Sequence, residues 1–195
     1  AEPWISLALF VLATSVTPGP NKLLLLASGL NLGLRRTLPL LLGISAGFAT
    51  LLLLTGLGLG AAIRDAPWLE RAMLLAGSAY LLWLAWRIWH AAPHLEAAGA
   101  PPRLGFRHGF VLQAVNPKAW MMALSTVGLY LQAGDLAALL AAVATFILLG
   151  LPCNFVWAMG GTMLAGLRAR PGRLKLVNRV LAAVLVGSVA LVLVR

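Results

Sequence analysis

The chain has 195 residues, of which 61% are hydrophobic and only 10% are charged. A water-soluble domain would carry about 25% charged residues, so this composition excludes an ordinary soluble protein and predicts an integral membrane protein. The net charge of +10 would also suit a nucleic-acid-binding protein. In a membrane protein, however, it is typical of loops that face the cytoplasm and its anionic lipid surface. We therefore expect membrane lipid, and no nucleic acid, as a partner.

Six apolar segments alternate with short polar joins. Each is close to or longer than the roughly 20 residues that a membrane-spanning helix needs. Their approximate limits are 4–30, 37–60, 68–89, 109–132, 136–160 and 176–194. We predict an all-α integral membrane protein with six transmembrane helices, forming one membrane transport domain over residues 1–195. The first residues lack a basic stretch and a cleavage site, so we expect no removable signal peptide.

The first segment is interrupted near its centre by Thr17-Pro18-Gly19-Pro20-Asn21-Lys22. Neither proline donates a backbone hydrogen bond, and each pushes the preceding residue out of the helical conformation. Unpaired backbone groups that face lipid are costly, so this break must face protein or a polar cavity. A lysine at membrane depth is also costly and is usually functional. All six residues are therefore candidate substrate-binding residues, against the alternative of a simple proline kink.

Basic residues collect in the joins that follow segments one, three and five. With their flanks, these joins hold ten basic residues: Arg35, Arg36, Arg87, Arg103, Arg107, Arg168, Arg170, Arg173, Lys175 and Arg179. The opposite side holds three: Arg64, Arg71 and Arg195. The positive-inside rule therefore predicts that these three joins lie in the cytoplasm and that both termini lie outside.

The two remaining basic residues are Lys22 and Lys118, and both lie inside apolar segments. Lys118 belongs to a second interruption, Val115-Asn116-Pro117-Lys118, in the fourth segment. The first segment of each half thus carries a Pro/Asn/Lys break. Three segments per half is an odd number, so the halves must have opposite orientations, as in an inverted repeat with its binding site between paired broken helices. We predict two inverted three-helix repeats, about 1–92 and 107–195, with helices one and four broken.

A third polar interruption, Pro152-Cys153-Asn154, lies in segment five. The Asn154 side chain offers both hydrogen-bond donors and acceptors. A structural kink and a lining role at the site are both open readings here. Trp157 lies one helical turn further on and is also a candidate for substrate contact, although interface anchoring or packing is the more ordinary role of tryptophan in a membrane helix.

Other chemistry is not indicated. Cys153 is the only cysteine, so internal disulfides and dithiol relays are excluded. His90 and His94 have metal-ligand spacing, but Pro93 lies between them and no further ligand is fixed nearby, so we expect a solvated loop and no metal site. The apolar segments contain no acid–base pair beyond lysine. We therefore expect that the protein is not an enzyme, and we assign no catalytic residue and no cofactor.

Several of these motifs together resemble the LysE/RhtB family of amino-acid exporters. They are Thr17-Pro18-Gly19-Pro20-Asn21, Gly29-x-x-x-Gly33-x-Arg35, Gly43-x-x-x-Gly47 and Asn116-Pro117-Lys118. The stretches 79–86 and 154–161 are most similar to the cysteine/O-acetylserine exporter branch. The resemblance covers nearly the whole chain and implies secondary export of amino acids across the bacterial inner (plasma) membrane. Some relatives carry an acidic residue in the fifth segment, where this chain has apolar residues and Asn154, which argues against a cationic substrate.

A site can be derived from the paired breaks. The half-helices that follow Pro20 and Pro117 would begin at mid-membrane, with their free N–H groups and positive dipole ends directed into a central space. Such ends attract carboxylates. We therefore expect the substrate carboxylate to bind between the two breaks, close to Lys22 and Lys118. Asn21, Asn116 and Asn154 would bind the remainder of the amino acid, and Gly19 would permit close backbone approach.

The sequence favours a secondary transporter for small, neutral amino acids or their derivatives, coupled to the proton gradient. One of the two lysines would carry the coupling, since no carboxylate or histidine lies at membrane depth. The alternatives are an uncoupled amino-acid channel or facilitator and, less favoured, a cation exporter of the same superfamily, because two lysines repel cations. The sequence leaves monomer and homodimer open.

Overall fold

The computed structural model describes residues 2–60, 65–90 and 104–193, and these residues form helices without any strand. Arg64, His94, Glu96, Arg103 and Arg195 fall outside the described residues, as do Ala1 and the prolines at 93, 101 and 102. The helices are α1 (Glu2–Val16), α2 (Pro20–Leu32), α3 (Leu34–Leu54), α5 (Pro67–Trp89), α6 (Phe106–Val115), α7 (Pro117–Tyr130), α8 (Leu136–Met163) and α9 (Pro171–Leu193). A π-helical turn (Thr55–Leu59) extends α3, and a 3-10 turn (Leu164–Ala169) joins α8 to α9.

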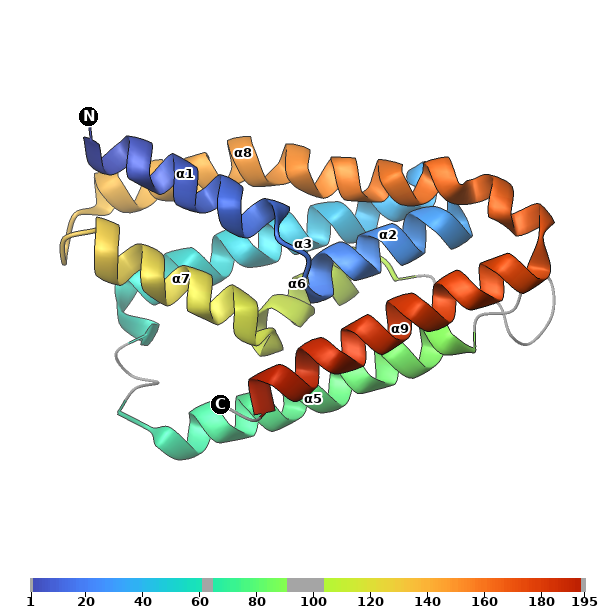
Figure 1. Cartoon of the computed structure of the whole chain (residues 1–195). Coiled ribbons are helices and arrows are strands. Elements are labelled where there is room, and N and C mark those ends of the chain that lie inside the picture. The colour runs from blue at the N-terminus through green and yellow to red at the C-terminus, as the bar shows by residue number, and fades with distance from the viewer. Residues whose placement is uncertain (1, 61–64, 91–103, 194–195) are drawn as a thin grey trace.

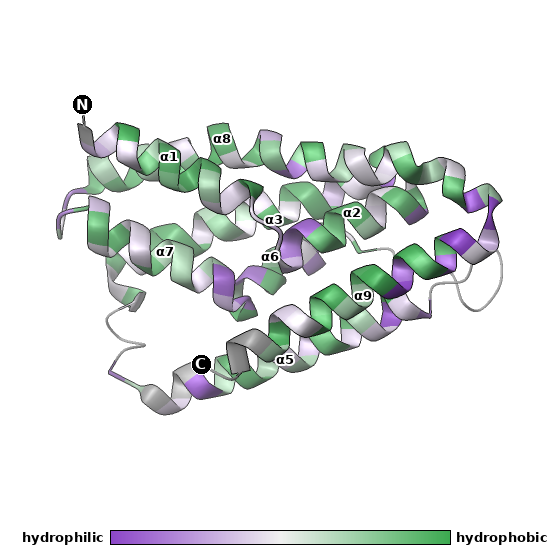
Figure 2. Cartoon of the chain, viewed as in Figure 1, coloured by the Kyte–Doolittle hydropathy of each residue, from purple (hydrophilic) through white to green (hydrophobic). Residues whose placement is uncertain are grey.

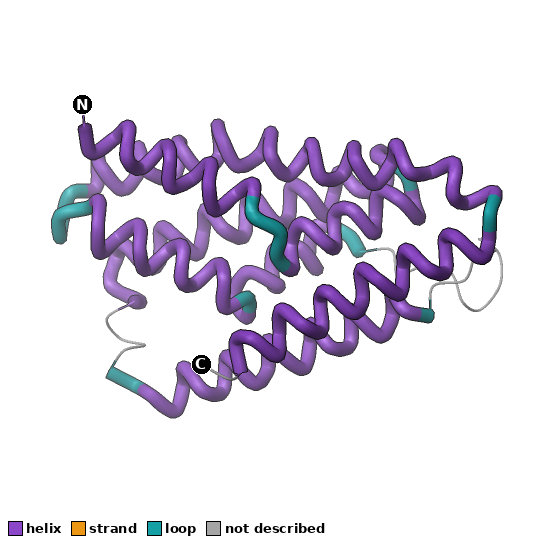
Figure 3. Tube along the Cα trace, viewed as in Figure 1, coloured by secondary structure: helices purple, strands orange, loops and turns teal. Residues whose placement is uncertain are grey.

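Both predicted breaks are present and end one helix before the next begins. α2 begins at Pro20 and α7 begins at Pro117, so each proline occupies the first helical position. There the missing N–H is no loss, because the first N–H groups of a helix have no partner within it. α1 and α2 meet at a bend of 51°. Figure 3 shows both breaks as loop positions midway along the bundle, not at its ends.

The described residues include three helices long and apolar enough to cross a membrane: 34–59, 71–89 and 136–169. The bent α1–α2 pair is a fourth if it counts as one span. α6 and α7 have 10 and 14 residues, so each is shorter than the roughly 20 residues of a full span. The helical class is thus confirmed, whereas these criteria find three or four of the six predicted spans.

Close backbone packing at glycines holds the centre of the bundle together. A Cβ atom on Gly161 would lie 2.1 Å from the Leu26 carbonyl oxygen, and one on Gly29 would lie 2.2 Å from that of Ala158. These reciprocal contacts define the α2–α8 seam. A second seam joins α3 to α6, where a Cβ atom on Gly43 would lie 2.0 Å from the Phe106 carbonyl oxygen. Glycine permits such backbone approach between membrane helices.

α5 and α9 pack side by side and form a pair set apart from the other helices (Figure 1). Two features attach this pair to the rest. Asn31 of α2 and Asn178 of α9 exchange reciprocal amide hydrogen bonds of 3.0 and 3.2 Å, and both side chains are buried. On α5, a Cβ atom on Gly77 would lie 1.8 Å from the Val115 carbonyl oxygen at the end of α6. The pair therefore lies directly beside the second break.

Two joins are shorter than the sequence suggested. Gly33 alone separates α2 from α3, with φ +81°, a conformation that glycine adopts readily. Arg35 and Arg36 consequently lie in the first turn of α3. α8 extends to Met163 and the 3-10 turn follows, so only Arg170 separates that turn from α9. Figure 2 shows hydrophilic residues at the α8–α9 junction and at the central breaks, among other positions, while much of the helix surface is hydrophobic.

Candidate functional site

An amide cluster joins the two breaks. Asn21 of α2 and Gln113 of α6 exchange hydrogen bonds of 2.9 and 3.1 Å. Asn116, between α6 and α7, also donates to the Asn21 side-chain oxygen at 3.1 Å. The Asn116 oxygen in turn accepts from the backbone N–H of Lys118 at 3.1 Å and so caps α7. The two breaks therefore meet at one largely buried polar cluster.

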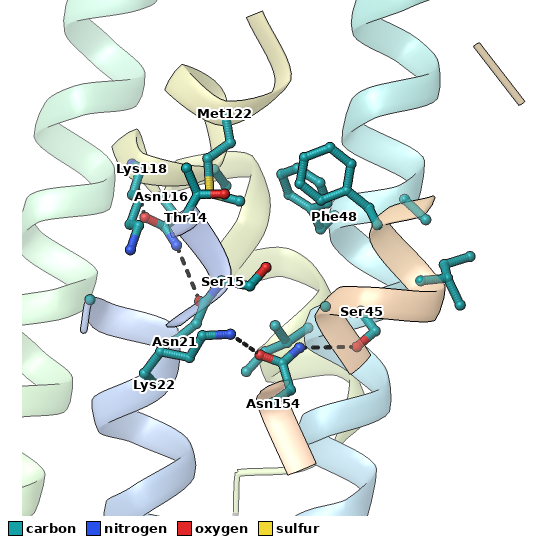
Figure 4. Close-up of a pocket in the computed structure, with 17 residues that line it drawn as sticks. Thr14, Ser15, Asn21, Lys22, Ser45, Phe48, Asn116, Lys118, Met122 and Asn154 are labelled. Atoms are coloured by element: carbon teal, nitrogen blue, oxygen red, sulfur yellow. Dashed lines mark hydrogen bonds between the residues drawn. The ribbon is translucent and has the colours of Figure 1, made fainter. Parts of the chain in front are cut away.

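Lys22 is buried, with 7% of its surface exposed. Its ammonium donates to the side-chain oxygen of Asn154 on α8. The Asn154 amide then donates to the Ser45 hydroxyl of α3 at 3.2 Å (Figure 4). This chain of contacts ties α2, α8 and α3 together. It satisfies the amide of Asn154, but Lys22 receives no negative counter-charge from it.

Lys118 reaches from α7 to the first break. Its ammonium donates to the Thr17 carbonyl at 2.8 Å, just beyond the end of α1. The side chain passes directly over Gly19, where a Cβ atom would lie 2.9 Å from the lysine Cδ atom. Glycine at position 19 leaves room for this side chain, while the predicted close approach of the Gly19 backbone to a substrate stays a prediction.

A cavity of about 60 Å³ lies among these groups, which is space for a few water molecules. One wall is polar and the other is apolar. The polar wall comprises Thr14, Ser15, Asn21, Lys22, Ser45, Asn116, Lys118 and Asn154, with Gly19 and Gly150 beside it. On the apolar wall, Phe48 of α3 and Phe146 of α8 pack with ring centroids 4.7 Å apart, next to Met122 and Ile147. The cavity thus presents polar groups on one side and an apolar surface on the other.

Six of the eleven predicted site residues line this cavity: Gly19, Asn21, Lys22, Asn116, Lys118 and Asn154. Thr17 contributes its carbonyl to Lys118, while its hydroxyl donates to Ala13. Pro18, Pro20 and Pro117 shape the breaks from behind the cavity wall. Trp157 does not line the cavity and instead packs against the apolar cluster that contains Leu23.

Sequence reasoning missed Gln113, Ser45 and the Phe48–Phe146 pair. Gln113 is fully buried and also donates to the Gly109 carbonyl at 3.0 Å. Its position one turn before Asn116 in an apolar segment was a usable signal, because a polar side chain there must find a partner. Ser45 and the two phenylalanines carried no such signal, since serine and phenylalanine are ordinary residues in membrane helices.

The charge of the cavity is one-sided. Its lining includes two ammonium groups and no acidic residue. In the part of the chain that the structure describes, no group of three His, Cys, Asp or Glu residues is placed to hold a metal ion. Two positive groups without an acidic partner in the lining favour a ligand with an anionic group, since charge-assisted hydrogen bonds are stronger than neutral ones.

Spanning helices, helix breaks at mid-bundle and a small polar cavity at the breaks together define a membrane transporter of the helical type. Comparison with known proteins gives the same class. Residues 12–195 match the family model described as "LysE type translocator". The chain therefore belongs to the LysE family, as the sequence motifs predicted.

Curated relatives carry the name "Cysteine/O-acetylserine efflux protein". The relative from Escherichia coli (strain K12) is 32% identical over 180 residues, which covers 91% of this chain and 90% of that protein. The relative from Salmonella typhimurium (strain LT2) is 32% identical over 155 residues, or 78% of each chain. These names indicate transport proteins, not enzymes. No solved structure was found to match the chain.

Proposed function

We propose that this protein is a secondary transporter that exports small, neutral amino acids or their derivatives from the cytoplasm. The observation that carries the proposal is the cavity at the two helix breaks, where Lys22 and Lys118 lie without any acidic partner. An amino-acid carboxylate would supply the missing negative charge. The amides of Asn21, Asn116 and Asn154 would then bind its remaining polar atoms.

Substrate size and charge follow from the two walls. No carboxylate lines the cavity to bind a cationic side chain, which favours neutral substrates. The Phe48–Phe146 pair closes the apolar side and favours a short side chain. Cysteine and O-acetylserine, which the relatives' names mention, are small neutral amino acids that carry a free carboxylate, and they suit both features.

The proposed architecture is six spans in two inverted repeats. Support comes from the order of elements, since a broken pair (α1–α2, then α6–α7) opens each half and two longer helices follow it. α3 and α8 occupy equivalent places in the two halves and both line the cavity, and α5 and α9 are also equivalent and pair with each other. This arrangement is typical of carriers that bind substrate at the repeat interface.

The proposed location is the bacterial inner membrane, with both termini on the outer side. The supporting observation is charge. Arg35 and Arg36 begin α3, and Arg168, Arg170, Arg173 and Lys175 surround the α8–α9 junction. Both regions lie at the end of the bundle away from the N-terminus (Figures 1 and 2). By the positive-inside rule, that end would face the cytoplasm.

Alternating access would operate through the glycine seams. The α2–α8 and α3–α6 seams bring backbone against backbone in the basic half of the bundle. In the other half, the atoms nearest to a Cβ on Gly56 belong to the side chain of Leu139, and a cavity of about 360 Å³ lies between the π-helical turn and the α7–α8 turn. We interpret this as a conformation closed toward the cytoplasm, from which the seams would separate to admit substrate.

Coupling to the proton gradient is the remaining element of the proposal. Lys22 and Lys118 are the only basic groups that line the cavity. A lysine that loses its proton in the empty site and regains it when a carboxylate arrives would link proton and substrate occupancy. Each ammonium donates to one protein oxygen, that of Lys22 to Asn154 and that of Lys118 to the Thr17 carbonyl. We favour Lys118 because it lies deeper in its break motif.

The experiment is a transport panel in proteoliposomes of the purified chain. Labelled serine, cysteine, O-acetylserine, lysine and glutamate are tested with and without an imposed pH gradient. The proposal expects movement of the small neutral compounds, with accumulation only under the gradient. Movement of the same compounds without accumulation would indicate a facilitator, and movement of lysine alone would refute the substrate class.

A further inference from the structure

A second cavity lies on the opposite side of the breaks from the first. Its volume is about 130 Å³, and it lies between the two breaks and the α5–α9 pair. Gly19, Asn116, Pro117 and Lys118 form one wall, while Ser78 of α5 and Ser188 of α9 form the other. This volume is space for several water molecules. Gly19, Asn116 and Lys118 line both cavities, so the two spaces adjoin at these residues.

The Ser78 hydroxyl has an unmet hydrogen-bonding capacity. Only 5% of the residue is exposed, yet its hydroxyl makes no hydrogen bond with any described residue. Ser188 differs, because it donates to the Leu185 carbonyl at 2.7 Å. The buried Thr55 hydroxyl likewise bonds to the carbonyl one turn back, at 2.7 Å. A buried hydroxyl that lines a cavity and lacks a protein partner is normally bonded to ordered water.

Lys118 is the ionisable group that this water would reach. Of the residues that line the two cavities, only Lys118 and Lys22 ionise, and Lys22, on α2, lines the first cavity alone. α5 and α9 contribute hydroxyl and aliphatic groups to the second cavity and no charge. Thus the α5 and α9 residues of the second cavity give Lys118 a polar surrounding to which they add no charge.

We propose that the second cavity is a hydrated proton-exchange site for Lys118, separate from the substrate cavity. In one direction the Lys118 ammonium gives one proton to a cavity water and becomes a neutral amine, and the proton leaves as hydronium along water bonded to Ser78. The reverse transfer restores the ammonium. This inference rests on the proposed function, because it gives Lys118 a route to protons that a bound substrate does not block.

Hydration is tested first, without reference to transport. Ser78→Cys is made in a Cys153→Ala background, and labelling by a small water-soluble methanethiosulfonate is measured on the full chain in liposomes. The matched control is Ala79→Cys, because Ala79 is the next residue and is exposed on the outside of the helix pair, where lipid would surround it. We expect labelling at position 78 to be at least tenfold faster than at position 79. Equal or slower labelling at 78 would overturn the hydrated cavity even if the protein transports amino acids.

Coupling is tested with Ser78→Leu, which fills the cavity, against Ala79→Leu as control. One coupled proton per substrate supports about tenfold accumulation per pH unit, since each tenfold ratio corresponds to about 1.4 kcal/mol. With labelled serine or O-acetylserine, Ser78→Leu should keep counterflow exchange within about twofold of the parent, while accumulation falls to a ratio near one.

Full accumulation by Ser78→Leu would exclude this cavity as the proton route. Equal loss of exchange and accumulation would also overturn the proposal, because Ser78 would then support the substrate path or the fold. If the leucine variant fails to fold, the same measurements are made on Ser78→Ala, which removes only the hydroxyl. It should slow gradient-driven uptake severalfold and leave exchange unchanged. If the parent protein transports nothing, the proposed function is refuted instead. The labelling experiment at position 78 remains valid in that case, because it does not require transport.

Discussion

Replacing Asn116 with alanine should abolish transport and leave the protein in the membrane. The side chain has two roles: its oxygen caps α7 through the Lys118 N–H, and its amide donates to Asn21, each at 3.1 Å. Loss of an N-cap costs about 1 kcal/mol, and loss of one hydrogen bond costs about another. The sum of about 2 kcal/mol is smaller than the usual free energy of unfolding of about 5–15 kcal/mol, so the fold should survive.

Asn116→Ser separates the two roles. Serine is a good N-cap residue, but its shorter side chain cannot replace the amide that reaches Asn21. We therefore expect the serine variant to recover most of the thermal stability lost by the alanine variant and none of the transport. Membrane content is measured by immunoblot, stability by thermal unfolding in detergent and transport by counterflow. Trp68, 71% exposed on α5, is the control position, and its replacement should matter much less. Parental transport by Asn116→Ala would show that the break is a structural kink and would refute the reasoning.

Three further outcomes are expected. Gly161→Leu should lower the temperature of thermal unfolding and reduce the transport rate by more than tenfold, because the leucine Cβ atom would lie 2.1 Å from the Leu26 carbonyl oxygen. An unchanged unfolding temperature would refute the α2–α8 seam. Phe146→Ala should admit larger neutral amino acids by opening the apolar wall, and an unaltered substrate range in the transport panel would count against that wall. In intact cells that express the protein with Cys153 replaced by alanine, Ala169→Cys should resist an impermeant thiol reagent while Ala133→Cys reacts. The reverse labelling would invert the proposed orientation.

Local chemistry in the sequence was enough to find the breaks. Proline has no N–H group, so inside an apolar segment it either bends the helix or ends one helix and begins the next. The structure places both predicted helix starts at the expected prolines. Asn21, Lys22, Asn116, Lys118 and Asn154 line one cavity, and their role in binding substrate stays a prediction. Intramembrane polar groups are costly alone, so they gather wherever the fold provides partners.

The rotation of each helix about its axis was harder to predict. In membrane helices, lipid-facing and buried positions can both be apolar, so hydropathy does not separate the two faces. This explains why Trp157 was expected at the site although it packs into an apolar cluster. It also explains why Ser45 and the Phe48–Phe146 pair escaped notice. The Asn21–Gln113 bonds join residues 92 positions apart, and local pattern carries no information about such a pairing.

The central claim is that the substrate carboxylate binds between the two breaks beside Lys22. The most direct measurement is competition for labelled serine or O-acetylserine bound to the purified protein, comparing free serine with its methyl ester. A hydrogen bond to a charged group contributes about 1.5–3 kcal/mol, so the parent should bind the free acid at least about tenfold more tightly than the ester. Lys22→Gln should remove that preference while the ester binds as before. Equal binding of acid and ester by the parent, or a preference unchanged in Lys22→Gln, would contradict the account.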